Sequence, residues 1–318
     1  MANPHEAELA YPLGDTLPEP GQALEIAPGV RWVRMRLPFA LDHVNLWLLR
    51  DRDGGRDGWA IVDCGIDDAT TRDAWERVFA DALDGLPVLR IIVTHMHPDH
   101  IGLAHWLCER WRQADGEPLR LWISATDWNA AHMASRSTTG FGGDGAARHF
   151  ARHGLVDAEA LAKVRARTGY YPSMVPAVPP RFARLMHGQT VPVGDGHWHA
   201  LAGYGHAPEH IALHEPGLGV LISGDMVLPR ISTNVSVVDL EPEADPLSLY
   251  LQSIDALRAL PEGTLVLPSH GRPFRGLHRR IAQLHAHHDE RLDAVLRACG
   301  ERAHSPADLL PLMIRRPL

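Results

Sequence analysis

Residues 91–100 read IIVTHMHPDH and place several metal-binding side chains at the end of an apolar run. These side chains are His95, His97, Asp99 and His100. Imidazole nitrogens and carboxylate oxygens are ligands that borderline divalent metals prefer. His95 and His97 lie two residues apart just past a predicted strand, where an extended backbone points them the same way. Asp99 and His100 begin the next predicted helix, so one loop could offer a ligand pair to each of two neighbouring ions.

Further single residues of the same chemical types stand at later predicted strand ends. His206 lies in GYGHAPEH, Asp225 in LISGD and His270 in LPSHG. Each follows an apolar run and has a glycine beside or near it, where the backbone can turn tightly. We therefore expect these side chains at the open edge of a sheet, within reach of the 91–100 loop.

The chemistry that such a cluster supports is the activation of water. A bound Zn²⁺ lowers the pKa of its water to about 7, and two ions that share one water favour hydroxide further. That hydroxide can attack a carbonyl or phosphoryl centre. Each ligand histidine must be neutral, so activity should fall as the pH drops. No GxSxG motif suggests a serine nucleophile instead.

The segments THMHPDH, GHAPEHIAL, SGD and PSHG, in this order, resemble the metal motifs of the metallo-β-lactamase fold superfamily over roughly residues 24–275. The resemblance implies that His95, His97 and His206 hold one ion and that Asp99, His100 and His270 hold a second. It also implies that Asp225 bridges the two ions, and that Asp99 and Asp225 serve catalysis. The ions expected are two divalent metals, zinc first and iron or manganese as alternatives.

Two further residues are expected to support the ligands. Asp63 in IVDCG matches an acidic residue of the family at that strand end, and His210 lies four residues past His206. One departure from the family pattern is GYGH where many relatives read TPGH, which puts the turn before His206 in question.

Simpler roles are open for several of these residues. Asp99 could only cap the helix beside it, and Asp225 or Asp63 could only accept hydrogen bonds in a turn. His210 is expected in a structural or supporting position rather than as a ligand. With 21 histidines in the chain, a lone histidine carries little information.

The pattern of the remaining chain predicts an α/β fold, an αββα sandwich in which two sheets lie between helical layers. Expected strands and helices are interleaved through both halves. The predicted strands are 31–37, 43–49, 59–65, 88–93, 119–124, 198–203, 210–215, 219–225 and 264–270. The predicted helices are 68–83, 100–112, 245–260, 277–299 and a short one near 306–314.

The expected organisation has four parts. Residues 1–23 read as a loose N-terminal arm and 24–276 as the catalytic domain. Within that domain, 126–186 is an irregular, helical insertion whose aromatic and methionine side chains could cover a pocket. Residues 277–318 form a C-terminal helical module, of which 284–310 resembles the module, often winged-helix-like, of a lactamase-β-like subgroup. An amphipathic helix packed on the sandwich is the alternative.

Composition narrows the choice of partners. The net charge of −8 disfavours nucleic acid as the main partner without excluding it. Three separated cysteines suit reduced thiols, and no run of eighteen apolar residues could span a membrane. We expect a cytoplasmic protein with a small-molecule substrate and no membrane partner, and a homodimer remains open.

The full ligand set resembles that of dinuclear hydrolases such as glyoxalase II-like thioesterases, lactonases and phosphodiesterases. A true β-lactamase is disfavoured because no cysteine stands at a matching second-site position. An ester, thioester or lactone is the expected substrate. A phosphodiesterase or ribonuclease is one alternative, and an iron-dependent oxidoreductase of the persulfide dioxygenase kind is another. Arg136, Arg181 and Arg230 could hold an anionic group.

Overall fold

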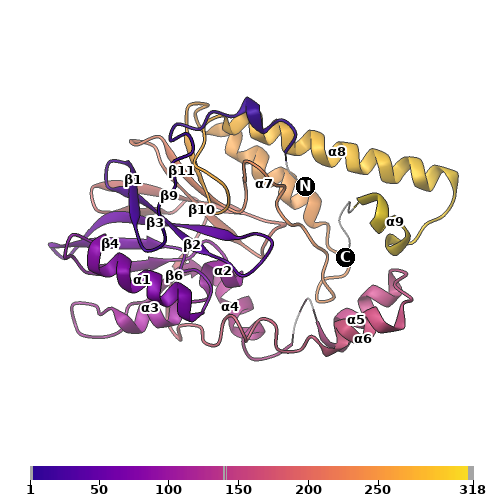
Figure 1. The fold of residues 1–318 in the computed structure, drawn as a ribbon, viewed down its shortest axis with the longest axis horizontal. Coiled ribbons are helices and arrows are strands. Elements are labelled where there is room, and N and C mark those ends of the chain that lie inside the picture. The colour runs from indigo at the N-terminus through magenta and orange to yellow at the C-terminus, as the bar shows by residue number, and fades with distance from the viewer. Residues whose placement is uncertain (1–2, 139, 141, 314–318) are drawn as a thin grey trace.

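Two β-sheets pack face to face between outer layers of helices in the computed structural model, which describes residues 3–138, 140 and 142–313 (Figure 1). The αββα arrangement predicted from the sequence is confirmed. Helices from the first half of the chain cover one outer face, and helices from its end cover the other (Figure 1).

The first sheet contains seven strands that lie side by side in chain order. They are β1 (Ala23–Ala27), β2 (Val30–Arg36), β3 (His43–Asp53), β4 (Arg56–Val62), β5 (Val88–Ile92), β6 (Leu121–Ser124) and β7 (Phe182–Leu185). β1 to β4 are antiparallel neighbours, whereas β4 to β7 run parallel. The carboxyl ends of β4, β5 and β6 therefore meet at one edge.

The second sheet has five strands in the order β12-β11-β10-β9-β8. They are β8 (Thr190–Val193), β9 (Gly196–Gly203), β10 (His210–Glu215), β11 (Val220–Gly224) and β12 (Leu265–Pro268). Only β11 and β12 are parallel to each other, so their carboxyl ends also share an edge.

Three apolar layers alternate with the sheets because successive side chains of a strand point to opposite faces. Trp32 and Trp47 lie between the two sheets with Trp198 of the second sheet. Their strand neighbours Val33 and Leu46 instead pack under the helices of the first outer layer. Because both faces of these strands are buried, their sequences read as nearly continuous apolar runs.

Nine α-helices surround the sheets in the described part of the chain, together with two short 3-10 segments. The helices are α1 (Ala69–Asp81), α2 (Pro98–Ile101), α3 (Ala104–Arg110), α4 (Ala125–Ala134), α5 (Gly143–Arg152), α6 (Ala158–Ala166), α7 (Pro246–Ala256), α8 (Leu277–Glu301) and α9 (Pro306–Met313). The 3-10 segments are η1 (Glu6–Glu8) and η2 (Leu257–Ala259). No helix among the described residues is long and apolar enough to cross a membrane.

The helix predicted over 100–112 is wrong as one element, because α2 ends at Ile101 and α3 begins at Ala104. Gly102 lies between them, against backbone from the end of β4. A Cβ atom at Gly102 would lie 2.7 Å from Gly65 O and 2.7 Å from Asp67 N. This close approach requires glycine at position 102 and seats the metal-binding loop on the neighbouring turn. The helical hydrogen bonding is interrupted at Leu103, whose N–H donates to Gly65 O at 3.1 Å.

The N-terminal segment is not loose, as the sequence suggested. Leu9 is buried, and the Ala10 N–H donates to Arg275 O at 3.2 Å. Asn3 Nδ2 donates to Gln283 Oε1 of α8 at 2.9 Å. Residues 3–10 therefore pack against the start of α8 and extend the outer layer.

The segment 126–186 contains most of α4 and all of α5 and α6, but its last residues form β7 at the edge of the first sheet. Trp128 stacks on Phe182 of this strand with ring centroids 4.5 Å apart. Part of the segment thus completes the first outer layer. Phe141, one of the aromatic side chains expected to cover a pocket, lies outside the described residues.

The C-terminal helices leave the sandwich after a packed start. Leu277, Ile281 and Leu284 of α8 are buried with α7 over the second sheet, whereas Leu296 is exposed. α9 returns toward α5, where the Ala307 N–H donates to His153 O at 3.0 Å (Figure 1). Within residues 277–313 no strand follows these helices, so the described module has no wing.

Candidate metal centre

The shared edge of the two sheets brings together all seven side chains that the sequence singled out as ligands. They form two groups. Within each group, the ligand atoms all lie within 4.8 Å of one another. One group is His95, His97, His206 and Asp225, and the other is Asp99, His100 and His270.

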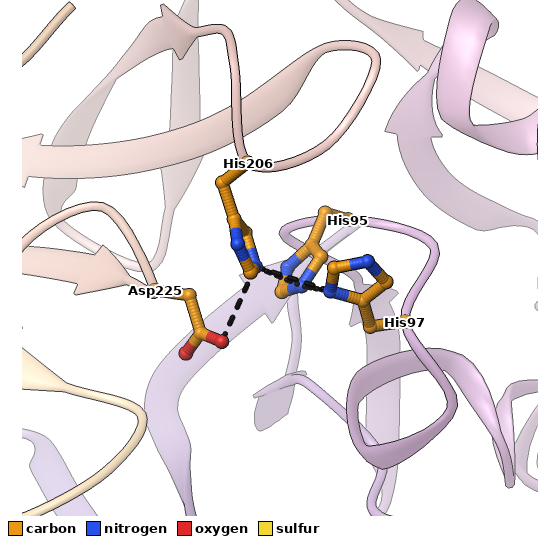
Figure 2. Close-up of side chains that lie close together, drawn as sticks. All are labelled: His95, His97, His206 and Asp225. Atoms are coloured by element: carbon orange, nitrogen blue, oxygen red, sulfur yellow. Dashed lines mark hydrogen bonds and ion pairs between the residues drawn. The ribbon is translucent and has the colours of Figure 1, made fainter. Parts of the chain in front are cut away.

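The first group combines the loop after β5 with the turn between β9 and β10 (Figure 2). His95 Nε2 lies 2.9 Å from His97 Nδ1, and His206 Nε2 lies 3.1 Å from each of these atoms. Asp225 Oδ2 is 3.3 Å from His206 Nε2. Three ring nitrogens and one carboxylate oxygen thus converge, which is the donor number of a tetrahedral zinc site.

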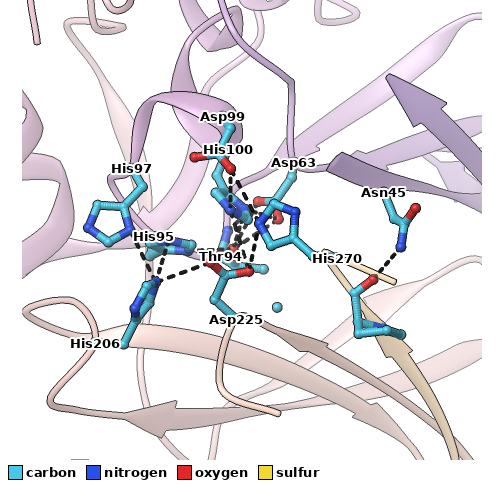
Figure 3. A network of polar contacts seen from close by, with 12 residues as sticks. Asn45, Asp63, Thr94, His95, His97, Asp99, His100, His206, Asp225 and His270 are labelled. Carbon is cyan, nitrogen blue, oxygen red and sulfur yellow. Dashed lines mark hydrogen bonds and ion pairs between the residues drawn. The ribbon is translucent and has the colours of Figure 1, made fainter. Parts of the chain in front are cut away.

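The second group joins α2 to the turn after β12 (Figure 3). Asp99 Oδ2 lies 3.5 Å from His100 Nε2 and 3.4 Å from His270 Nε2. Asp225 Oδ1 is 3.7 Å from His100 Nε2 and 3.3 Å from His270 Nε2. Asp225 therefore turns one oxygen toward each group, as a bridging carboxylate must.

The second ring nitrogen of four histidines is occupied by the protein, which fixes the nitrogen left for a metal. His95 Nδ1 contacts Thr94 Oγ1 at 3.0 Å, and His206 Nδ1 contacts Asn234 O at 2.8 Å. His100 Nδ1 lies 2.8 Å from Asp63 Oδ2, and His270 Nδ1 lies 2.7 Å from His43 O. A carbonyl or carboxylate oxygen accepts the Nδ1 proton in three of these rings, and in His95 the acceptor is the Thr94 hydroxyl, which itself donates to Asp63. The Nε2 atom of each ring is therefore left for a metal.

Asp63 orders the metal-binding loop from the end of β4. Its backbone adopts φ 63°, an uncommon conformation for a residue with a side chain. Its Oδ1 accepts the Thr94 N–H at 2.7 Å while Oδ2 faces the His100 ring. This carboxylate therefore positions His100 and the residue before His95, in the supporting place expected from the sequence.

His210 lies beneath the centre and belongs to neither ligand group. Its Nε2 accepts the Asp225 N–H at 3.2 Å, and the ring is fully buried. Only glycine fits at position 224, because a Cβ atom there would lie 2.0 Å from His210 Nε2. The SGD motif thus places a glycine without a side chain over His210, next to the carboxylate that faces both groups.

The turn before His206 rests against α7. Gly205 has φ +92°, and a Cβ atom there would lie 2.2 Å from Pro246 O. The Tyr204 N–H donates to Ser253 Oγ at 2.8 Å. In GYGH the glycine that precedes His206 makes the close approach, while Tyr204 is partly exposed.

His270 is held from the first sheet by Asn45 of β3 (Figure 3). Asn45 Nδ2 donates to Pro268 O at 2.7 Å and to Gly271 O at 2.9 Å. The Asn45 N–H also donates to Ser269 O at 2.7 Å. These three bonds fix both sides of the turn that presents His270.

Asp127 is a site residue that the sequence analysis missed. It is fully buried and accepts the N–H groups of Met96 at 2.8 Å and Glu209 at 2.6 Å. It thereby joins the loop of His95 and His97 to the loop of His206. Burial raises the pKa of Asp127 to about 6, although these N–H donors favour its charged form. Ser124 and Asp127 have the spacing of a helix capping box, the one sequence signal for this position.

The charges in the centre suit bound cations. Burial opposes ionisation, but the carboxylates of Asp225 and Asp99 raise the pKa of His270 to about 10 and hold that of His100 well above its usual range. By contrast, burial lowers the pKa of His97 to about 3 and that of His95 well below its usual range. Two carboxylates therefore attract positive charge while His95 and His97 stay neutral and able to bind a metal.

Two buried atoms lack a partner in the way a metal site predicts. His100 Nε2 and Asp225 Oδ1 make no hydrogen bond within the described parts of the chain. Buried polar atoms without a partner are rare and costly in folded proteins. The donor set, the fixed ring orientations and these orphaned atoms fit two borderline divalent ions.

Comparison with known proteins agrees with this geometry. The family model described as the Metallo-beta-lactamase superfamily matches residues 40–270. The chain is similar to a beta-lactamase domain protein from Burkholderia ambifaria, with 55% identity and a TM-score of 0.91, covering 98% of this chain and 88% of that one. No curated protein matches the chain.

Two more distant structures share the fold. A metallo-beta-lactamase family protein from Thermus thermophilus is 28% identical with a TM-score of 0.66, covering 85% of this chain and 83% of that one. A metallo-beta-lactamase from Pontibacter korlensis is 14% identical with a TM-score of 0.53, covering 82% of this chain and 95% of that one. At this identity the Pontibacter structure supports the fold alone.

Proposed function

The chain belongs to the metallo-beta-lactamase superfamily, and on that premise we propose that it is a dinuclear metal-dependent hydrolase. The substrate class we propose is an ester, thioester or lactone. Most members of the superfamily hydrolyse their substrates with metal ions, but membership alone names neither the metal nor the bond cleaved.

The observation that carries the proposal is the position of Asp225 between two ligand groups. Its Oδ2 faces the His95, His97 and His206 group, and its Oδ1 faces His100 and His270. A single-metal enzyme would not require the second group of Asp99, His100 and His270 beside the first. The complete second group therefore favours a dinuclear hydrolase over an enzyme of the mononuclear iron dioxygenase type.

The residues named would hold two divalent ions, and zinc is the metal we propose for them. When bound, such ions supply a water that deprotonates near neutral pH and polarise the carbonyl that is attacked. Asp99 and Asp225 are the carboxylates of the two ligand groups, and we assign them the catalytic role of holding a proton at the centre. Asp63, Thr94 and the backbone oxygens of His43 and Asn234 keep four imidazoles correctly oriented.

A carbonyl substrate is favoured over a nucleic acid phosphodiester by charge. The chain carries a net charge of −8, which disfavours a polyanion.

Neither Cys64 nor Cys108 presents a thiol to the centre, because both are buried in the apolar layer under the helices of the first outer layer. The second ligand group is thus built from Asp99, His100 and His270 without a thiolate.

Metal analysis followed by a substrate panel tests the proposal. We expect about two zinc ions per chain and hydrolysis of a thioester or lactone that stops on chelation and returns with zinc. The panel includes S-lactoylglutathione, an acyl homoserine lactone and bis-p-nitrophenyl phosphate. A preference for the phosphodiester would move the function to a phosphodiesterase, and one iron per chain with oxygen uptake would replace hydrolysis by oxidation.

A further inference from the structure

A cavity of about 380 Å³ lies against His270, and the proposed function assigns no role to it. Its walls include Arg34, Leu41, His43 and Ile231, and His270 itself is part of the lining. Two carboxylates also line it, but Glu6 lies beside Arg230 and Asp15 accepts from Arg272, which leaves Arg34 uncompensated. This volume is in the range of small-molecule pockets. No residue of the 126–186 insertion contributes to the described wall.

Arg34 is the cation in this wall that has no partner. It lies on β2 opposite Asn45 of β3 and is half-buried, and its guanidinium makes no hydrogen bond or ion pair with any described residue. Arg272, in contrast, donates to Gly14 O at 2.6 Å and to Asp15, and stacks on a tyrosine ring. The Arg230 guanidinium is mostly exposed and lies 3.8 Å from Glu6.

The carboxylate nearest in sequence does not neutralise Arg34 by contact. Asp42 attracts its charge, but Asp42 is 79% exposed and its Oδ1 accepts from His43 Nδ1 at 2.6 Å. A half-buried guanidinium without a partner is costly, and burial lowers the pKa of Arg34. Charged groups with perturbed pKa values cluster at functional sites, where a ligand can supply the missing partner.

The cavity borders the centre at His270, the one residue of the two ligand groups in its described wall. The His270 Nε2 faces Asp99 and Asp225, while its Nδ1 donates to His43 O. The Gly271 N–H donates to His43 Nε2 at 2.8 Å, and burial lowers the pKa of His43 to about 4, so this ring is neutral. A molecule in the cavity would therefore meet the charge of Arg34 at one wall and His270 of the second ligand group at another.

We propose that Arg34 binds an anionic group of the substrate, a carboxylate or a phosphate, while the bond to be cleaved lies at the metal centre. This inference rests on the proposed function and narrows its substrate to an anionic ester, thioester or lactone. A guanidinium can bind either anion with two parallel hydrogen bonds, which gives orientation as well as affinity. Leu41 and Ile231 offer apolar contact to the chain between the two ends.

A matched pair of substrates tests the proposal in the zinc-loaded protein. The 4-nitrophenyl monoester of glutaric acid carries a carboxylate where 4-nitrophenyl valerate carries a methyl group. For Arg34→Gln we expect kcat/KM on the glutarate ester to fall by roughly 10- to 100-fold, mainly through KM. Hydrolysis of the valerate ester should change by less than about 2-fold, which also shows that the variant is folded.

Arg36→Gln is the control, because Arg36 is exposed two residues along the same strand and is not part of the cavity wall. It removes the same charge and should leave both esters unchanged. Arg34→Lys should recover part of the loss. Equal effects of Arg34→Gln on both esters, or no effect on either, would overturn the proposal.

Direct binding separates this inference from the proposed function. Calorimetry with glutarate, and separately with inorganic phosphate, measures the anion site without any bond cleavage. If neither ester is hydrolysed but Arg34→Gln alone loses anion binding, the hydrolase assignment fails and the anion site stands. If Arg34→Gln binds both anions as the unaltered chain does, the anion site fails. Tighter binding of phosphate than of glutarate would identify the group as phosphate.

Discussion

At the scale of single residues, the site depends on hydrogen-bond acceptors that fix which nitrogen of each histidine ring is free to bind a metal. Four imidazoles give their Nδ1 proton to an oxygen of the protein, so that each Nε2 points at the centre. The exception is His97, which presents Nδ1 to its neighbours. Ligand residues and their acceptors therefore act as pairs, and either member can be tested.

Asp225→Asn is expected to separate the bridging role from folding. The amide keeps the size of the side chain but loses the negative charge that both groups share. Metal content should fall from about two ions per chain to one or fewer, and kcat/KM should fall by more than about 100-fold. Mass spectrometry under native conditions counts the ions. Asp73→Asn, at an exposed position on α1, should change neither quantity, and two retained ions in Asp225→Asn would refute the bridge.

Asp127→Asn is expected to weaken the first group selectively. The amide can accept only one of the two N–H groups that the carboxylate now accepts, and its own NH₂ would face the other. Zinc affinity of the weaker-bound ion should fall by about 10- to 100-fold, with a loss of unfolding free energy of about 1–3 kcal/mol. Competition with a chromogenic chelator measures the affinity. A loss of stability with unchanged zinc affinity would leave Asp127 a purely structural residue.

Most of the site was predictable from the sequence because each ligand follows an apolar strand and stands beside a turn. Asp127 was not, since its two bonds join loops 82 and 31 residues away and its local pattern reads as a helix cap. Arg34 was missed for a similar reason: its importance lies in the absence of a partner, which no pattern in RWVRMRL reveals. Of the arginines considered as anion holders, Arg181 instead pairs with Glu117 at 2.7 Å.

At the scale of elements, the strands that bury both faces were predictable, whereas three of the four edge strands, β1, β7 and β8, were not. β1 has no fully buried residue, β7 has four residues, and β8 contains Pro192. Each therefore lacks the long apolar run by which β3, β10 and β12 were recognised. The break between α2 and α3 was also hidden, because Gly102 is required by contact with Gly65 and Asp67 rather than by any helix-ending signal.

The turn that carries His206 offers a test of how closely an element must fit. In Gly205→Ala the new Cβ atom would collide with Pro246 O of α7, in addition to straining a left-handed backbone. Gly188→Ala is the matched control, because φ there is +76° and nothing lies within 4 Å of the added atom. The control should lose roughly 1–2 kcal/mol of unfolding free energy. Gly205→Ala should lose more and bind zinc more weakly, and equal losses with intact zinc binding would contradict the fit proposed for this turn.

At the scale of the whole molecule, the centre joins two sheets whose contact is otherwise mainly apolar, with a few hydrogen bonds such as those of Asn45. His95, His97, Asp99 and His100 follow strands of the first sheet, whereas His206, Asp225 and His270 follow strands of the second. Ligands that bind the folded chain alone stabilise it by mass action. Removal of the ions should therefore lower the melting temperature of the entire sandwich, rather than loosen one loop.

The size of this stabilisation should depend on pH in a direction that the pKa shifts determine. Without ions, the carboxylates overcome burial and raise the pKa of His270 to about 10, from 6.5 in the unfolded chain, and that of His100 also rises. Protonated rings then stabilise the ion-free fold below about pH 6.5, and this contribution is lost as the pH rises toward 10. Metal binding needs neutral rings and so releases protons across that window.

We therefore expect the difference in melting temperature between zinc-loaded and chelated protein to be larger at pH 8.5 than at pH 6.5. Titration calorimetry in buffers of different ionisation enthalpy should count about one to two protons released from the second group per chain at pH 7.5. His95 and His97 should release none, since burial already keeps both rings neutral. His270→Gln should reduce the count by about one. A proton count of zero, or one that His270→Gln leaves unchanged, would show that the two carboxylates do not hold these imidazoles in their charged form.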